Sequence, residues 1–212
     1  MPSPKPAFSK ILDVCRELTA ELPDIVFIGG VAVYLHSLRK TLVSAPPEAS
    51  HDGDFAISFV DYGALKDAIE VVPNQRLGKH QMVYENIEFD IYVDRLSRLV
   101  VPYDAILAYS PVIEDVHVAS LEHLLVLKLE ACLDREQSSK GKKDARDIVK
   151  IGLLLRRRAD MNLIRPYLHD KLEKLLERLA RSTVFHDLCS GNAHAAKKAR
   201  TAFAAFATEL CS

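Results

Sequence analysis

Two aspartates separated by a single residue stand at the start of a stretch that alternates between polar and apolar side chains, residues 50–59. Side chains alternate along a strand, so Asp52 and Asp54 would project from one face while Phe55 and Ile57 project from the other. Two like charges at that spacing are unfavourable unless a cation lies between them, and Mg²⁺ prefers oxygen ligands. We therefore expect a metal-binding strand here; the alternative is a half-exposed strand that happens to begin with acids.

A later part of the chain supplies a third carboxylate. Residues 81–84 and 87–94 predict two strands that are joined by a hairpin at Glu85-Asn86. In the second strand the aliphatic side chains share one face, and Asp90 lies on the other. The position of this carboxylate relative to the first two depends on how the strands pair.

If this strand lies beside the one that carries Asp52 and Asp54, all three aspartates point the same way. Three aspartates on adjacent strands can hold two Mg²⁺ ions about 3.5–4 Å apart, which is the arrangement for in-line phosphoryl or nucleotidyl transfer. Asp94 is a rival for the third position, but Asp90 comes earlier on the strand and is flanked by apolar residues. The sequence thus predicts a two-metal centre built from Asp52, Asp54 and Asp90.

A short apolar run upstream leads directly into two glycines. Residues 24–28 predict a buried strand, Gly29 and Gly30 follow it, and residues 31–38 predict a helix. Backbone amides at a helix N-terminus can approach a phosphate closely here, because glycine has no side chain in the way. The alternative is a tight turn from strand to helix with no ligand.

The C-terminal half contains a lysine in an unusual place. Residues 121–135 predict a helix with an apolar stripe, and Lys128 lies in the middle of that stripe. A lysine there costs stability unless it reaches an anion, so we expect it to meet nucleotide phosphates; the alternative is that its ammonium extends into water. In the next predicted helix, residues 142–156, Asp144 lies along the apolar edge and Asp147 nearer the polar side. A structural ion pair between the two helices is the rival explanation for Asp144.

Charge is distributed unevenly along the chain. Residues 1–133 carry 11 Lys and Arg against 19 Asp and Glu, whereas residues 134–212 carry 17 against 10. An acidic half beside a basic half suits a metal centre joined to a surface that binds polyanions. The clusters at 156–158 and 197–198 could bind an RNA backbone, and solvated helix ends are the alternative.

Composition excludes several classes. With 212 residues, 49% of them hydrophobic, the chain can bury a core in one domain or two small ones. No stretch approaches the ~18 apolar residues of a membrane span, and residues 1–6 lack the apolar segment of a secretory signal. The cysteines are scattered without zinc-binding spacing, which fits free thiols in a reducing cytoplasm: Cys15, Cys132, Cys189 and Cys211. We expect a cytoplasmic protein that does not enter a membrane.

In chain order, these features resemble the DNA polymerase β-type nucleotidyltransferase superfamily: the Gly29-Gly30 pair, a helix with His36 and Arg39, the Asp52 and Asp54 strand, and the later Asp90. Within that superfamily, the chain resembles the AbiEii-like group of abortive-infection, toxin-type nucleotidyltransferases over residues 24–156. The resemblance implies that Gly29, Gly30 and Arg39 bind the nucleotide, with the glycines holding its triphosphate. It also implies that the three aspartates bind metal and that Asp90 activates the acceptor hydroxyl.

The helical half adds to the resemblance. Lys128 and Asp144 resemble the later motifs of this group, in which a lysine and an aspartate complete the nucleotide site, so Lys128 would belong to both the catalytic and the nucleotide-binding set. The chain departs from the group in two places. A Pro46-Pro47 loop separates the arginine from the acids, and Gly53 stands between the acids where an apolar residue is usual.

These observations predict an α+β fold with a nucleotidyltransferase-type mixed sheet flanked by helices in residues 1–135, followed by a helical region in residues 136–212. The expected reaction moves a nucleoside monophosphate from a nucleoside triphosphate to an acceptor hydroxyl, with two Mg²⁺ ions. By resemblance, the acceptor is a tRNA end, another RNA or a protein side chain, and the protein is a toxin with a cognate antitoxin. One alternative is a small-molecule, antibiotic-type nucleotidyltransferase, which would need an acidic cleft. Another is a non-catalytic nucleotide-binding member.

Overall fold

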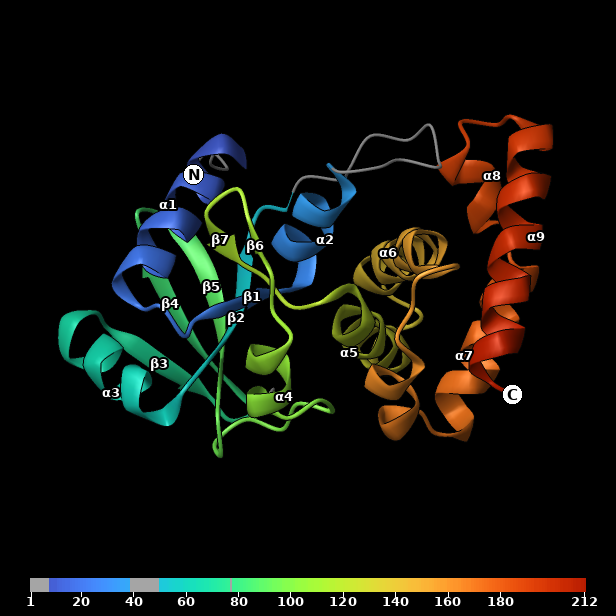
Figure 1. Ribbon diagram of the computed structural model, residues 1–212. Helices are drawn as coiled ribbons and strands as arrows, with labels where there is room; N and C mark the ends of the chain where they lie inside the picture. The colour runs from blue at the N-terminus through green and yellow to red at the C-terminus, as the bar shows by residue number, and fades with distance from the viewer. Residues whose placement is uncertain (1–7, 39–49, 77) are drawn as a thin grey trace. The chain divides into compact units, whose positions relative to one another are not determined.

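The computed structural model of the protein describes residues 8–38, 50–76 and 78–212 (Figure 1). Within these described ranges the chain folds into two compact units, one made of residues 8–35 and 50–120 and the other of residues 36–38 and 121–212. The first unit holds a mixed β-sheet with helices, and the second is helical, so the predicted α+β fold class is confirmed. Among the described residues, no helix is both long enough and apolar enough to cross a membrane.

The sheet of the first unit has five strands in the spatial order β1-β2-β5-β4-β3. Their bounds are Val26–Ile28 for β1, Gly53–Ile57 for β2, Val71–Asn74 for β3, Lys79–Tyr84 for β4 and Ile87–Val93 for β5. Strands β2 and β5 run parallel, and the other neighbours are antiparallel. The three predicted metal-binding aspartates could point the same way only if β2 and β5 are neighbours, and the two strands do pair.

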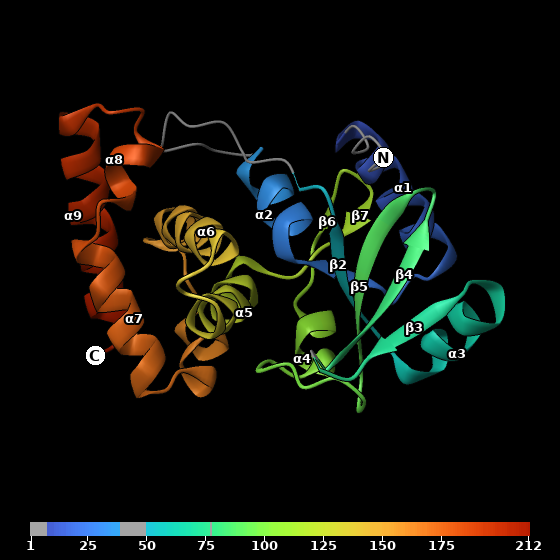
Figure 2. The ribbon, with the colours of Figure 1, turned by 180° about the vertical axis from the view of Figure 1, so that it is seen from behind.

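Helices cover the apolar face of this sheet. Figures 1 and 2 show α1 (Phe8–Glu21) and α3 (Phe59–Ala68) on the same face. On that face the rings of Phe27, Phe55 and Phe89 come from adjacent strands, with centroids 5.7 and 6.0 Å apart, and all three are buried. Burying a side chain of this size stabilises the fold by about 1.5–3 kcal/mol. The aromatic contacts therefore fix which face of β2 and β5 points inward, and Asp54 and Asp90 take the other face.

The remaining elements of this unit complete the connections. They are most of α2 (Gly29–Ser37), together with α4 (Tyr103–Ala108), β6 (Val112–Ile113) and β7 (Val116–His117). The predicted hairpin between β4 and β5 is confirmed, because both Glu85 and Asn86 have positive φ, as a two-residue type I′ turn requires. Strand β3 was not predicted, because Pro73 reads as a terminator. It lies at the sheet edge, where a residue without an N–H donor is tolerated.

The second unit is built from helices and short turns. They are α5 (Leu121–Asp134), α6 (Ser139–Leu155), the 3₁₀ turns η1 (Met161–Leu163) and η2 (Arg165–Tyr167), α7 (Asp170–Arg181), α8 (Val184–Leu188) and α9 (Ala193–Leu210). Residues 161–167 form 3₁₀ turns and not an α-helix, since Pro166 lacks an N–H and disfavours helical geometry in the residue before it. Helix α6 begins three residues earlier than predicted, because the Ser138 side chain accepts a hydrogen bond from the Gly141 amide at 3.0 Å.

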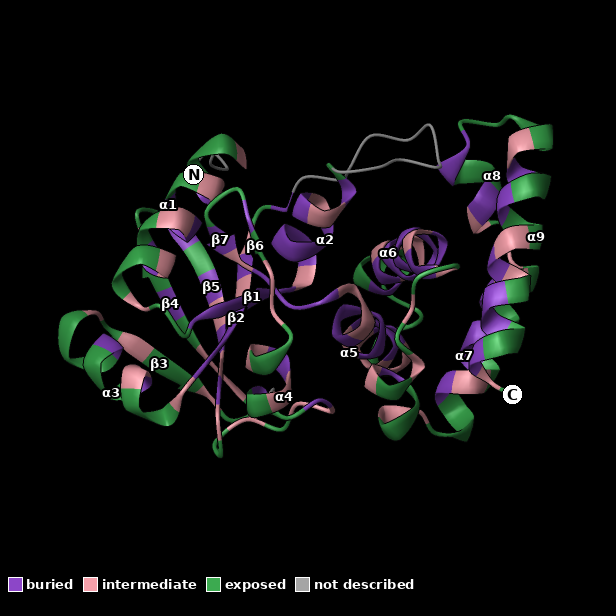
Figure 3. Ribbon diagram, viewed as in Figure 1, coloured by how far each residue is buried: buried purple, intermediate pink, exposed green. Residues whose placement is uncertain are grey.

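Close packing between α6 and α9 depends on a glycine. A Cβ atom at Gly152 would lie 2.7 Å from Cε2 of Phe203, so the aromatic ring fills the space that a side chain would take. Figure 3 shows that α9 is buried along one side and exposed along the other. This is the pattern of an amphipathic helix whose apolar stripe faces a core.

A buried histidine makes the stability of the helical unit depend on pH. His123 on α5 is fully buried, its ring lies 6.1 Å from that of Tyr167, and burial lowers its pKa from the usual 6.5. Because the unfolded chain binds the proton more readily than the folded one, the stability contributed by neutral His123 is complete above pH 6.5 and decreases below it. The free energy of unfolding is expected to fall by up to about 1.4 kcal/mol per pH unit in that range.

Urea unfolding of wild type and His123→Gln between about pH 7.5 and pH 5.5 measures this effect. The variant is expected to lose less stability on acidification than the wild type. Some dependence should persist, because burial and Lys66 also lower the pKa of His80. The exposed His194 supplies the control, since His194→Gln should leave the slope unchanged. Equal slopes for wild type and His123→Gln would contradict the prediction.

Candidate active site

Two of the three predicted metal-binding aspartates lie side by side. Asp54 on β2 and Asp90 on β5 are register partners on neighbouring parallel strands, so their side chains leave the same face of the sheet. Both residues are half-buried. On the other side of β2, Ile28 at the end of β1 is the register partner of Asp54, which places the start of α2 beside it. The strand pairing thus brings the candidate acids to the Gly29-Gly30 turn.

Asp52 lies just before β2. Its Oδ1 accepts a hydrogen bond from the hydroxyl of Ser50 at 2.9 Å, and Ser50 is buried. The rival Asp94 follows the end of β5, where its carboxylate pairs with Arg95 at 3.2 Å. Within the described ranges, no three His, Cys, Asp or Glu side chains gather closely enough to form a ready-made metal site. Binding of metal by all three aspartates therefore stays a prediction.

Gly29 is required at the start of α2 for two physical reasons. Its φ of +69° lies in the left-handed region, and a Cβ atom there would lie 2.2 Å from Oδ2 of Asp54. The carboxylate of Asp54 therefore packs directly on the first residue of the helix. The predicted strand, Gly-Gly and helix arrangement is present, and amides at a helix N-terminus favour anions. Phosphate binding by Gly29 and Gly30 stays a prediction.

Gly53, the departure between the two acids, has a packing explanation. A Cβ atom at this position would lie 2.3 Å from Cε1 of Phe89 on the neighbouring strand. The core ring of Phe89 takes the place of the apolar side chain that the resemblance leads one to expect. The substitution therefore belongs to the sheet core and leaves the faces of Asp52 and Asp54 unchanged.

Asp90 already has partners on the next strand. Its Oδ2 accepts from the ammonium of Lys79, and its Oδ1 accepts from Nε2 of Gln81 at 2.9 Å. Our sequence interpretation missed Lys79, although a signal exists. The turn at Glu85-Asn86 sets Gln81 opposite Asp90, and Lys79 lies two residues further along the same face.

In the helical unit, Lys128 meets carboxylates of its own protein. Its Nζ lies 3.0 Å from Oδ1 of Asp144 and 3.0 Å from Oδ2 of Asp147, while Nε of Arg135 lies 2.7 Å from Oδ2 of Asp144. The contact between Lys128 and Asp147 is an ion pair and not a hydrogen bond. The side chains of Lys128, Asp144 and Asp147 are 8%, 2% and 3% exposed. We name these four residues the buried charge cluster.

This cluster bears on two interpretations from sequence. Periodicity placed Asp147 nearer the polar side of α6, and that is wrong, because pairing with Lys128 allows the carboxylate to be buried. The rival explanation for Asp144, an ion pair between α5 and α6, describes its actual contacts. Nucleotide binding by Lys128 and Asp144 stays a prediction, and Arg39 lies outside the described residues.

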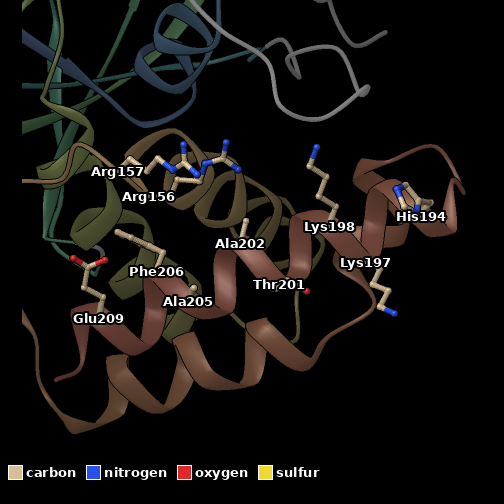
Figure 4. A pocket seen from close by; sticks show the side chains of 10 residues that line it. All are labelled: Arg156, Arg157, His194, Lys197, Lys198, Thr201, Ala202, Ala205, Phe206 and Glu209. Atoms are coloured by element: carbon tan, nitrogen blue, oxygen red, sulfur yellow. The ribbon is translucent and has the colours of Figure 1, made fainter.

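A basic groove runs along α9 within the helical unit. It has a volume of about 880 Å³, and its basic lining comes from the end of α6 and from α9: Arg156, Arg157, His194, Lys197 and Lys198. Figure 4 shows the guanidinium groups of Arg156 and Arg157 side by side, with Lys198 extending from α9 in a similar direction and Lys197 pointing the other way. Two charge clusters that are about forty residues apart in the sequence thus line one surface.

A second hollow lies on the sheet of the first unit. It has a volume of about 570 Å³, and its lining includes Glu70, Gln81, Val83 and Glu88. Gln81 donates a hydrogen bond to Asp90, so the hollow adjoins the candidate acids. Its charged side chains are both acidic, whereas those of the groove on α9 are basic apart from Glu209.

Neither a protein-family model nor a curated protein matches the sequence. Among solved structures, the chain is similar to JHP933 from Helicobacter pylori, with a TM-score of 0.52 and 18% identity, over 96% of this chain and 90% of that one. It is similar to a Helicobacter pylori protein proposed to be a nucleotidyltransferase, with a TM-score of 0.51 and 17% identity, over 96% and 92%. A nucleotidyltransferase-like antigen of Paracoccidioides brasiliensis matches at a TM-score of 0.48 and 16% identity, over 90% and 92%. The match to the Helicobacter pylori protein proposed to be a nucleotidyltransferase shows that the chain has a nucleotidyltransferase-like fold.

Proposed function

We propose that the protein transfers a nucleoside monophosphate from a nucleoside triphosphate to an acceptor hydroxyl, releasing pyrophosphate. One observation carries the proposal: Asp54 and Asp90 are register partners on parallel strands, and Asp54 packs against Gly29 at the start of a helix. Paired carboxylates beside a helix N-terminus provide, in one place, ligands for a divalent cation and donors for a phosphate.

The residues present fit a magnesium ion. Mg²⁺ is usually held by one or two carboxylates together with water and substrate phosphates, and Asp54 and Asp90 supply such a pair. Asp52, two residues before Asp54, is the ligand that we assign to a second ion. When bound, Mg²⁺ neutralises charge on the triphosphate and lowers the pKa of an attacking hydroxyl.

The chain's own residues would then act as follows. The amides of Gly29 and Gly30 bind the triphosphate, because the helix N-terminus carries unpaired N–H donors. Asp90 accepts the proton of the acceptor hydroxyl as that oxygen attacks the α-phosphorus, and pyrophosphate leaves with the electrons of the broken bond. The carboxylate of Asp54 lies beside the glycine amides and the carboxylate of Asp90. It fits against the start of the helix because Gly29 has no side chain.

We propose RNA, including the 3′ end of a tRNA, as the acceptor. The basic groove supports this choice, because cations that line a groove on one unit attract a phosphodiester backbone. The free thiols, of which Cys15, Cys132 and Cys189 are buried, suit a reducing cytoplasm. A toxin role, a cognate antitoxin and a protein side chain as acceptor stay predictions from the resemblance.

Labelled nucleoside triphosphates and total RNA test the proposal. Wild-type protein is expected to label RNA in the presence of Mg²⁺, and Asp54→Asn is expected to reduce the rate by at least about 10²-fold. The exposed Asp67 on α3 gives a matched control, since Asp67→Asn changes charge equally and should label RNA normally. Equal labelling by Asp54→Asn would refute the assignment of the site.

A small-molecule acceptor is the second candidate. The hollow beside Asp90 favours it, because Glu70 and Glu88 would attract a cationic acceptor such as an aminoglycoside. In the same assay, label that appears on an added aminoglycoside and not on RNA would favour this candidate. Calorimetry that detects neither Mg²⁺ nor triphosphate binding would instead indicate a non-catalytic protein.

A further inference from the structure

Asp90 is held by a desolvated ion pair as well as by a neutral donor. The side chains of Lys79 and Asp90 are 13% and 14% exposed, whereas those of the surface pair Lys10 and Glu85 are 44% and 56% exposed. A pair that is shielded from water interacts more strongly than an exposed one, because the effective dielectric constant is lower. The ammonium of Lys79 is therefore a substantial part of the electrostatic environment of Asp90.

The two carboxylate oxygens of Asp90 are both engaged by β4. Lys79 donates to Oδ2 and Gln81 donates to Oδ1, and Lys79 and Gln81 project from the same sheet face as Asp90 because of the β4–β5 register. A divalent cation needs at least one of these oxygens. Since a neutral amide binds a carboxylate less strongly than an ammonium does, the contact with Lys79 is the one that opposes a second cation most.

We propose that Lys79 is a built-in counter-cation of the candidate metal site, which a divalent ion must displace from Asp90. Asp54, Asp90 and Lys79 together carry a charge of −1, and the two aspartates alone carry −2. The ammonium thus offsets the repulsion between the neighbouring carboxylates when no metal is bound, and it weakens the affinity of the site for metal. The proposal rests on the metal-binding part of the proposed function.

Removing the charge of Lys79 should therefore tighten metal binding. Titration of the 212-residue chain with Mn²⁺, followed by calorimetry and by the electron paramagnetic resonance signal of free Mn²⁺, measures the affinity without any turnover. Lys79→Met is expected to bind Mn²⁺ at least about tenfold more tightly than the wild type, because a unit positive charge leaves the immediate surroundings of the ion. Lys79→Gln removes the same charge but keeps a donor for Asp90, and its affinity for Mn²⁺ should increase similarly. It provides the test if Lys79→Met folds poorly.

Two controls test whether the gain in Mn²⁺ affinity comes from net charge alone and whether the ion binds at Asp90. Lys10→Met removes one positive charge from the surface of the same unit, and it should leave the affinity within about twofold of wild type because exposed charges are screened. Combining Lys79→Met with Asp90→Asn should abolish the gain, because the carboxylate that the lysine blocks is no longer present.

The outcomes distinguish the two proposals. Equal Mn²⁺ affinity of wild type and both Lys79 variants, with measurable binding in all, would overturn the role of Lys79 and leave the metal site standing. Absence of Mn²⁺ binding in every protein, Lys79→Met included, would overturn both the role of Lys79 and the metal-dependent function. A gain that persists in the double variant would also overturn the role of Lys79, because it would show that the ion binds elsewhere.

Discussion

Replacing Lys128 with methionine is expected to lower the free energy of unfolding of the helical unit by about 3–5 kcal/mol. The variant leaves two carboxylates, those of Asp144 and Asp147, buried without the ammonium that lies 3.0 Å from each. Arg135 still reaches Asp144, but its side chain is 41% exposed, so water screens much of that contact. Methionine has a similar length and packs well in a helix, so the loss comes from charge and not from a cavity.

Urea unfolding followed by circular dichroism measures this loss. Lys142→Met, at an exposed position of α6, is the matched control and should change stability by less than about 0.5 kcal/mol. Adding Asp144→Asn and Asp147→Asn to Lys128→Met should recover most of the stability, because replacing a whole buried ion cluster by neutral groups is often close to neutral. A loss below about 1 kcal/mol in Lys128→Met would show that the buried charge cluster contributes little to folding.

Comparing Lys128→Met with the triple variant, which also carries Asp144→Asn and Asp147→Asn, separates a structural role of Lys128 from a role in nucleotide binding. If the lysine serves only the buried charge cluster, the triple variant, once refolded, should bind nucleoside triphosphate with the affinity of the wild type. If the lysine binds nucleotide phosphates, as the resemblance implies, stability and nucleotide affinity should be lost together, and the added Asp changes should restore only stability. Calorimetric titration with a non-hydrolysable triphosphate distinguishes these results.

The second large effect is expected at Gly29. Gly29→Ala should lower the stability of the first unit by at least about 2 kcal/mol and abolish nucleotidyl transfer. The left-handed backbone alone costs alanine about 1–2 kcal/mol. In addition, the new Cβ would lie 2.2 Å from Oδ2 of Asp54, so the carboxylate has to move away from the helix start.

Two other glycines divide this effect into its parts. Gly78 has a φ of +62°, and the space where its Cβ atom would lie is open, so Gly78→Ala should show the backbone cost alone. Gly63 lies within α3 with neither a positive φ nor a neighbour within 4 Å, so Gly63→Ala should raise stability by about 0.5–1 kcal/mol. If Gly29→Ala resembles Gly78→Ala in stability and retains transfer activity, Asp54 does not depend on the space that Gly29 provides.

Much of the first unit could be predicted from the sequence, because the faces of a strand and the residues of a tight turn follow from patterns among neighbouring residues. The alternation along residues 50–59 and 87–94 placed Asp54 and Asp90 opposite the core phenylalanines, and the pairing of β2 with β5 confirmed that they share a face. The edge strand β3 was not predicted because proline, here Pro73, is typical of turns as well as of sheet edges. The order of charges along the chain likewise indicated a basic surface but not its shape.

Local sequence patterns set which residues can lie on one face of one element, since that follows from a period of about 2.0 or 3.6 residues. Which charges neutralise each other depends instead on how the elements pack. Lys128 and Asp144 are sixteen residues apart on different helices, and Lys79 reaches Asp90 from a neighbouring strand. Such pairs depend on the register and packing of separate elements, and those are set by the sum of many buried apolar contacts that no single local pattern contains.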